Sequence, residues 1–521
     1  MDRLKRFFVN GILMTCVAFA ARYVSVGFNI YLSNKIGAVA MGLFTLISSV
    51  YGFALTVATS GISLATTKLV SQALGKGQAR SDYNCHGTIR AIMKKSLLFS
   101  FSISTGAAII LFLSAEAIGV RILGDARTVA CLKILAFSLP PIALSSSMGG
   151  YFISLRRVYK NAVVQILAQA ARIYLCVILL SAAIATDTES ACIAIVTATT
   201  VSELLCCGFH GILFAFEQRK SKKHTEKKGI DLSLPSELIP ITIPVALSAY
   251  TRSALITIEH LLIPWGLERS GVGRDSSLAA YGSLHSIIFP LILFPSAISS
   301  SFAGLLVPEI SESDAADDKK RIERIVCRVL KTVLVYSIGT AGIMMCLSRE
   351  IATVLVPGTD SAFFIIIIAP LIPIMYLDTS VDSILKGLGY QFYTMMVNIV
   401  DSSLSVILVW LLLPRFGIMG YVMTVYFTEI INATLSITKL LLVTKPRVKI
   451  FDWIVKPLCA VIAATASSRY ILSSLNSYAQ NRFDIFTHVM LISVIYLLIL
   501  LLLRAISPKR IKRSIVGFIK A

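Results

Sequence analysis

The stretch FTHVMLISVIYLLILLLLRA at residues 486–505 contains no acidic side chain, and its first lysine or arginine is Arg504. A bilayer core about 30 Å thick is crossed by roughly 20 mostly apolar residues in a helix, so this stretch predicts a transmembrane helix. Similar stretches recur along the whole chain. We expect fourteen spans, at 8–31, 40–60, 96–115, 129–152, 160–184, 190–215, 237–264, 279–304, 327–347, 362–385, 392–413, 418–441, 453–472 and 486–505.

The overall composition supports a membrane protein. Of the 521 residues 56% are hydrophobic and 15% are charged, and the mean hydropathy is +0.79, which is far from the composition of a soluble globular domain. The first apolar stretch follows three basic residues but is too long for a signal peptide, and a second span follows it at once. We therefore expect it to be retained, in an all-α membrane protein of about fourteen helices.

The formal net charge of +21 alternates from loop to loop. Basic residues concentrate at 3–6, 76–95, 156–160, 219–228, 319–328, 445–449 and 509–513, whereas the intervening loops hold few. Fourteen spans with this alternation follow the positive-inside rule, with both termini in the cytoplasm. The pattern argues against nucleic acid as a partner and predicts that the basic loops lie against anionic lipid head groups.

The sequence shows no pattern for metal, cofactor or covalent chemistry. Most of the ten cysteines lie inside apolar spans, where cysteine behaves as a small hydrophobic residue. The histidines are scattered, and neither a Walker loop nor a nucleophile elbow occurs. We expect no metal and no cofactor, and transport driven by an ion gradient, the membrane potential or substrate flux.

An internal repeat organises the spans. Residues AMGLF at 40–44 align with AYGSL at 280–284 at an offset of 240, while Pro140 matches Pro373 and Gln165 matches Asn398 at a slightly smaller offset. Six spans return the chain to its starting side, so two parallel six-helix lobes in a V are expected, with the substrate between them. We expect an N-terminal lobe at 1–217, a basic cytoplasmic linker at 218–234, a C-terminal lobe at 235–443, and two further helices with a basic tail at 444–521.

Three arginines lie near the middle of predicted spans, namely Arg22, Arg172 and Arg252. An arginine at a helix centre costs roughly 2.5–3.5 kcal/mol on insertion scales, so each must face a cavity or a partner. Guanidinium groups bind phosphate oxygens through two parallel hydrogen bonds, which predicts a cationic cavity for an anionic substrate. The alternative is structural pairing, of Arg172 with Glu203 and of Arg252 with Glu259 or with a carboxylate of the other lobe.

Polar side chains accompany two of these arginines. Arg22 shares one helix face with Ser25 and Asn29, and Arg172 shares one with Gln165 and Gln169. We expect these polar faces to bind a sugar head group.

The predicted second lobe carries acids instead of bases. Asp378 lies on span 10, Asn398 and Asp401 lie on span 11, and Glu429 lies on span 12. Carboxylate and amide oxygens suit a hard cation, and a carboxylate away from water can instead carry a proton. Both readings couple transport to Na⁺ or H⁺; the alternative is charge pairing with the arginines.

Several runs in the middle of the chain resemble the stage V sporulation protein B family. They are IPITIPV at 239–245, IEHLLIPWGL at 258–267, FPLILFPSAISSS at 289–301 and LVPEISE at 306–312. The resemblance implies a flippase for an undecaprenyl-pyrophosphate-linked saccharide, a peptidoglycan precursor above all. Two departures leave room for a shifted substrate, because Asn29 replaces a usual second arginine, and Val39 with Ala40 replaces a usual acidic residue.

We therefore expect a monomeric exporter that moves a lipid-linked anionic saccharide outward by alternating access. The alternative is a drug or organic-cation antiporter from the same superfamily as the stage V sporulation protein B family, although three cavity arginines would repel cations. A polyprenyl-dependent glycosyltransferase is a weaker alternative, because such an enzyme would be expected to carry a catalytic acid or histidine in a sizeable soluble loop, and the loops here are short and basic.

Overall fold

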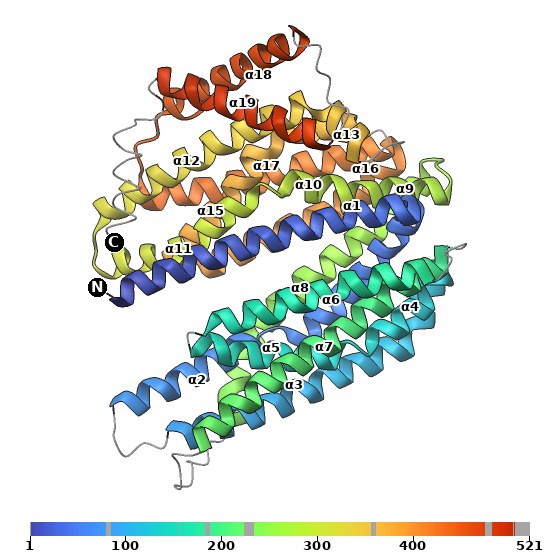
Figure 1. The fold of residues 1–521 in the computed structure, drawn as a ribbon, viewed down its shortest axis with the longest axis vertical. Helices are drawn as coiled ribbons and strands as arrows, with labels where there is room; N and C mark the ends of the chain where they lie inside the picture. Colours follow the sequence, from blue (N-terminus) through green and yellow to red (C-terminus); the bar gives the residue numbers. More distant parts are fainter. Residues whose placement is uncertain are drawn as a thin grey trace. The chain divides into compact units, whose positions relative to one another are not determined.

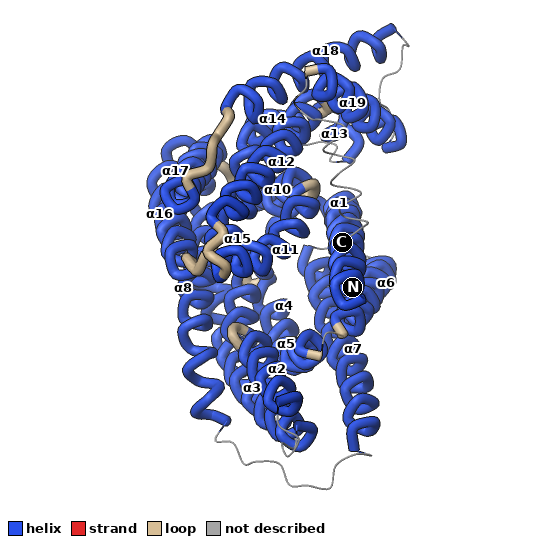
Figure 2. Tube along the Cα trace, turned by 90° about the vertical axis from the view of Figure 1, so that its left-hand side faces the viewer, coloured by secondary structure: helices blue, strands red, loops and turns tan. Residues whose placement is uncertain are grey.

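The computed structural model describes residues 2–79, 85–155, 157–182, 188–222, 234–355, 361–474, 482–503 and 505. These residues form helices joined by short loops, and no strand occurs among them (Figure 2). The prediction of an all-α protein is confirmed. Most of the predicted basic linker, at 223–233, and the basic tail at 506–521 lie outside the described residues.

The first two predicted spans follow one another in α1 (Asp2–Thr59), where a kink with non-helical backbone at Gly37 divides one helical part from the next. The Gly37 backbone adopts φ 82° and ψ 165°, a conformation that glycine reaches without the steric penalty of a Cβ atom. Next to this kink the chain passes from one compact unit to another. Residues 1–38 group with 266–521 as unit 1, and residues 39–265 form unit 2. These boundaries differ from those of the predicted lobes, whose role as moving bodies stays a prediction.

Unit 2 contains the second half of α1 and seven further helical elements, together with the larger part of an eighth. They are α2 (Ile62–Ala79), α3 (Cys85–Glu116), η1 (Ala117–Ile122), α4 (Arg127–Ala136), α5 (Leu139–Ser154), α6 (Val158–Ala182), α7 (Thr188–Lys222) and, in larger part, α8 (Leu234–Arg269). A chain of buried hydroxyls holds α2, α3 and α5 together. Thr66 Oγ1 lies 2.6 Å from Ser96 Oγ, which lies 2.9 Å from Ser147 Oγ.

Unit 1 contains the first part of α1 and the helices from α9 onward (Figure 1). They are α9 (Arg274–Ser283), η2 (Leu284–Ile288), α10 (Phe289–Leu293), α11 (Ser296–Ala315), α12 (Lys319–Cys346), α13 (Ser348–Leu355), α14 (Ser361–Ile368), η3 (Ala369–Leu371), α15 (Ile372–Gly387), α16 (Gln391–Phe416), α17 (Ile418–Thr444), η4 (Phe451–Val455), α18 (Lys456–Ser474) and α19 (Arg482–Leu502).

The packing inside each unit shows the internal repeat. In unit 2, α2 packs on α5, α3 on α5, and α6 on α7; in unit 1, α11 packs on α15, α12 on α15, and α16 on α17. Helix boundaries agree as well, since α5 and α15 both begin with proline in their first turn, at Pro140 and Pro373. These two prolines are 233 residues apart.

One offset of 233 also aligns the breaks in the helices. The break after Thr59 falls on Ile292, one residue before α10 ends at Leu293, and the Gly37 kink falls on Ser270 at the end of α8. The helix boundaries therefore favour this single offset over the predicted 240, which rested on near-chance identity between short runs.

The two C-terminal helices pack on α12. Figure 1 shows α18 and α19, in red, along α12, and all three helices contact one another. Two glycines of α12 permit the close approach, because a Cβ on Gly339 would lie 2.5 Å from Tyr496 Cε1 and one on Gly342 would lie 2.2 Å from Val461 Cγ2. The Tyr496 hydroxyl donates a hydrogen bond to the Val335 carbonyl oxygen at 2.7 Å.

Twelve helical segments of the described chain are long and apolar enough to cross a membrane, and the first begins at Arg22 within α1. The class of a multi-pass helical membrane protein is confirmed, whereas the exact count of fourteen stays a prediction. The helices are interrupted within the predicted spans 129–152, 279–304 and 362–385, which the apolar pattern did not reveal. Each of these spans contains proline residues, which lack a backbone N–H donor.

Candidate substrate and ion sites

The first half of α1 places Arg22 and Asn29 in unit 1. The Asn29 side-chain amide donates to the Ser286 carbonyl oxygen in η2, at 3.4 Å, and Ile30 packs against Ile287. Arg22, two turns earlier, is partly buried, and its charge interacts with the phenol of Tyr376 on α15. Residues 7–59 of α1 contain no acidic residue, and no described carboxylate forms an ion pair with Arg22.

Three carboxylates come together in the same unit. Asp378 on α15 and Asp401 on α16 both interact electrostatically with Glu429 on α17, and the three helices pack on one another in pairs. Carboxylates gathered away from water cannot all stay ionised unless a cation lies among them. This arrangement suits a site that takes up and releases one proton.

Two neighbouring polar residues have partners on their own helices, and a coupling role for Asn398 stays a prediction. Asn398 donates to the Thr394 carbonyl oxygen of its own helix at 2.7 Å, and Asp382 pairs with Lys386 at 3.2 Å. Within the described ranges, no three His, Cys, Asp or Glu side chains are placed to hold a metal ion together. The acidic cluster is therefore defined as Asp378, Asp401 and Glu429.

Unit 2 holds the other predicted substrate residues. Arg172 on α6 interacts electrostatically with Glu203 on α7, the contact expected of a structural pair. The charge of Glu203 also acts on Tyr51, whose hydroxyl lies 2.6 Å from Ser138 Oγ. Gln165 is exposed and Gln169 is partly buried on the same helix as Arg172.

Arg252 lies on α8, and its side chain is exposed. Two side chains of α8 near it donate to the second half of α1 within unit 2, Tyr250 to the Val57 carbonyl oxygen at 3.2 Å and Ser253 to Thr56 Oγ1 at 3.1 Å. The six predicted substrate residues thus fall into two groups, with Arg22 and Asn29 in unit 1 and the other four in unit 2. Their meeting in one cavity stays a prediction.

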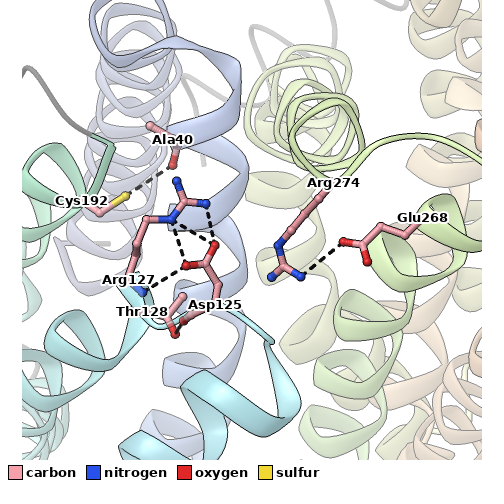
Figure 3. Close-up of polar contacts among 7 residues, drawn as sticks. All are labelled: Ala40, Asp125, Arg127, Thr128, Cys192, Glu268 and Arg274. Carbon is pink, nitrogen blue, oxygen red and sulfur yellow. Dashed lines mark hydrogen bonds and ion pairs between the residues drawn. The ribbon is translucent and has the colours of Figure 1, made fainter.

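Other arginines are neutralised locally (Figure 3). In unit 2, Arg127 forms a forked ion pair with the nearly buried Asp125, with Nη2 to Oδ2 at 2.6 Å and Nε to Oδ1 at 2.9 Å. In unit 1, Arg274 pairs with Glu268 at 3.5 Å. Arg127 and Arg274 therefore each have a carboxylate partner, and no described carboxylate forms an ion pair with Arg22.

Two tyrosines at the break between α10 and α11 were not predicted from the sequence. The Tyr376 hydroxyl donates to the Ile292 carbonyl oxygen at 2.7 Å, and the Tyr336 hydroxyl donates to the Pro295 carbonyl oxygen at 2.9 Å. A tyrosine in an apolar span gives no sign of which carbonyl it will meet. The double proline in FPLILFP, which interrupts the helix, was the available signal.

Comparisons with known proteins agree with this fold. The family model described as polysaccharide biosynthesis protein matches residues 8–312, more than half of the chain, and the MatE model matches residues 270–411. Stage V sporulation protein B of Bacillus subtilis (strain 168) is 22% identical over 520 residues, covering 98% of each chain. Sporulation protein YkvU of the same organism is 20% identical over 390 residues, 74% of this chain and 84% of YkvU.

Solved transporter structures share the architecture. The lipid II flippase MurJ in an inward closed conformation aligns with a TM-score of 0.67 at 13% identity, over 94% of this chain and 98% of that one. An inward-facing multidrug resistance MATE family transporter of the MOP superfamily aligns at 0.64 and 12% identity, over 83% and 100%. The chain belongs to the polysaccharide biosynthesis protein family, whose model matches more than half of its length.

Proposed function

We propose that this protein flips an undecaprenyl-pyrophosphate-linked saccharide, a peptidoglycan precursor, outward across the bacterial cytoplasmic membrane by alternating access. Both termini lie in the cytoplasm in this proposal. The observation that carries it is Arg22, a mid-helix cation on a helix without acids from residue 7 to its end. The matching relatives support the substrate class, since one is named as a lipid II flippase and another as stage V sporulation protein B.

The chemistry of the substrate fits the charges of the described helices. A pyrophosphate offers several oxygens to a planar guanidinium, and such charge-assisted pairs are about twice as strong as neutral hydrogen bonds. Arg252, exposed on α8, adds a second cation, and Gln165, Gln169 and Asn29 add amides that hydrogen-bond sugar hydroxyls. Arg172 interacts electrostatically with Glu203, so in this proposal it contributes less than Arg22.

The acidic cluster supplies coupling to an ion gradient. Asp378, Asp401 and Glu429 repel one another when all are ionised, so uptake of a proton or a sodium ion stabilises the site. A change in helix packing that separates the three carboxylates releases the ion. Transport then follows the gradient without an ATPase.

The lipid tail needs an apolar surface open to the bilayer, which α18 and α19 provide. Their outward residues are large and apolar, as exposed Ile462, Met490, Leu498 and Leu502 show. In this proposal the tail stays among these helices and the lipid while the charged head group crosses the membrane.

The experiment is replacement of Arg22 in a strain that lacks its own flippase. Arg22→Ala is expected to abolish complementation while expression and insertion survive, because removal of a mid-membrane charge lowers the insertion cost by roughly 2–3 kcal/mol. Arg22→Lys should rescue only in part, because an ammonium lacks the planar fork. Arg274→Ala is the matched control, since it removes one arginine that pairs with Glu268. Full complementation by a well-expressed Arg22→Ala protein would contradict the proposal.

The acidic cluster also favours a second candidate, an antiporter for drugs or organic cations. Three carboxylates would attract a cationic substrate directly. In that case Arg22→Ala would leave transport intact, and export of an organic cation would depend on Glu429.

A further inference from the structure

The helix that passes Arg22 in unit 1 is interrupted between α10 and α11. Phe294 and Pro295 separate Leu293 from Ser296, and Pro295 has no N–H to donate to the preceding turn. The first turn of α11 is closed by short-range bonds, from the Ala297 amide to the Phe294 carbonyl oxygen and from the Ile298 amide to the Pro295 carbonyl oxygen, both at 3.2 Å. An interruption of this kind leaves carbonyl oxygens that need other donors.

Two tyrosine hydroxyls supply those donors. Tyr376 from α15 is fully buried, donates to the Ile292 carbonyl oxygen at 2.7 Å, and is also in hydrogen-bonding contact with the backbone of Ser296. Its hydroxyl is thus inserted between the two backbone groups that an unbroken helix would join directly. Tyr336 from α12 donates to the Pro295 carbonyl oxygen, and its ring stacks on that of Tyr376 at 6.2 Å.

The matching break in unit 2 is supported differently. At the offset of 233, Tyr336 corresponds to Ile103 on α3 and Tyr376 to Ala143 on α5, and neither side chain carries a hydroxyl. There the chain turns at Gly61, with φ 77°, and the turn before the break receives one hydroxyl, from Tyr250 on α8 to the Val57 carbonyl oxygen at 3.2 Å. One repeat therefore has a break bridged by two stacked tyrosines, whereas the other has a break at a glycine with one longer tyrosine contact before it.

Arg22 lies beside the bridged break. Its neighbour Tyr23 contacts Phe294 with ring centroids 5.9 Å apart, and the charge of Arg22 interacts with Tyr376. The helix bearing Arg22 therefore contacts the break that Tyr376 supports.

We propose that Tyr336 and Tyr376 are positioning residues, which hold the break between α10 and α11 in one geometry so that the helix bearing Arg22 packs against a fixed wall. Bending during transport then occurs at the Gly61 break of the other repeat. The role of the two tyrosines in holding the break does not depend on the proposed function. Only the effect of this fixed break on transport rests on it.

Hydrogen exchange of the whole protein in lipid nanodiscs, without substrate, tests the bridge directly. Tyr376→Phe is expected to raise exchange of the amides at 296–298 roughly three- to tenfold, as expected from the loss of one hydrogen bond of about 1 kcal/mol. Tyr336→Phe should have a smaller effect, because the Pro295 oxygen keeps the Ile298 donor. In the wild type, the amides around Gly61 should exchange faster than those at 296–298.

Tyr496→Phe is the matched control, since this buried tyrosine also donates to a carbonyl oxygen, at 2.7 Å, but on the unbroken helix α12. It should leave exchange at 296–298 unchanged. Equal exchange in Tyr376→Phe and wild type, or an equal rise in Tyr496→Phe, would overturn the inference. The exchange measurement needs no substrate, so its result does not depend on the proposed function. If the wild-type protein moved no lipid-linked saccharide, the proposed function would fail, but the exchange result on the tyrosine bridge would still hold.

Discussion

Replacing Gly339 by alanine is expected to weaken the packing of α18 and α19 on α12. The new Cβ would lie 2.5 Å from Tyr496 Cε1 and 3.1 Å from both Cδ1 and Cζ. Since carbon atoms pack best at about 3.5–4.0 Å, the Tyr496 ring has to move by about 1 Å. That ring is buried, and its hydroxyl bond to the Val335 oxygen would be strained or lost.

The loss of stability in Gly339→Ala is the sum of two destabilising contributions and one stabilising contribution. Overpacking costs about 1–3 kcal/mol and the lost hydrogen bond about 1 kcal/mol, while alanine gains up to about 1 kcal/mol over glycine inside a helix. The net loss of stability is therefore about 1–3 kcal/mol. Gly106, the matched position on α3, has no atom within 4 Å of a built Cβ, so Gly106→Ala should be neutral or stabilising.

Reversible unfolding in mixed micelles measures the difference, with the fluorescence of Trp453, which is buried next to α18, as the probe. We expect Gly339→Ala to unfold at a lower denaturant fraction than Gly106→Ala. Gly342→Ala should behave like Gly339→Ala, because its Cβ would meet Val461 at 2.2 Å. Equal stability of the Gly339 and Gly106 variants would refute the reasoning.

Three further predictions concern charge. Neutralising Asp401 or Glu429 should alter the dependence of transport on pH or on sodium, measured in vesicles under an imposed gradient, and unchanged dependence in both variants would leave the cluster structural. A reporter fused after Lys223 should report the cytoplasm and one placed within 187–189 the outside; the opposite result at either site would overturn the fourteen-span topology. Glu203→Gln should lower the melting temperature, and a double-mutant cycle with Arg172→Gln should give a coupling of about 0.5–3 kcal/mol; additive effects would show that the two charges do not interact.

Much of the helical architecture could be predicted because lipid imposes one requirement on every span. An apolar run of about 20 residues has few alternatives to a helix in a bilayer, since each backbone group needs an internal partner. The kink at Gly37 lies between the first two predicted spans, 8–31 and 40–60, and has non-helical backbone. The breaks at Phe294 and Ala369 were visible only as proline residues within apolar runs.

Part of the candidate site could be predicted from the sequence, namely the charged residues within apolar spans; the contacts between helices could not. Asp378, Asp401 and Glu429 stand out because carboxylates in apolar spans are costly, and the three prove to interact. The grouping of Arg22 with these acids in unit 1 could not be read from the chain, because it depends on which helices the first part of α1 packs against. The bridge by Tyr336 and Tyr376 depends on tertiary contacts between helices distant in sequence.

Translocation by the purified protein in proteoliposomes tests the central claim most directly. A fluorescent undecaprenyl-pyrophosphate disaccharide, incorporated in both leaflets, is exposed to a membrane-impermeant quencher. We predict that quenching extends to the inner leaflet only when wild-type protein is present and an ion gradient is imposed, and that Arg22→Ala abolishes this movement. Movement of an organic cation by the same vesicles, with the lipid-linked saccharide left in place, would contradict the account.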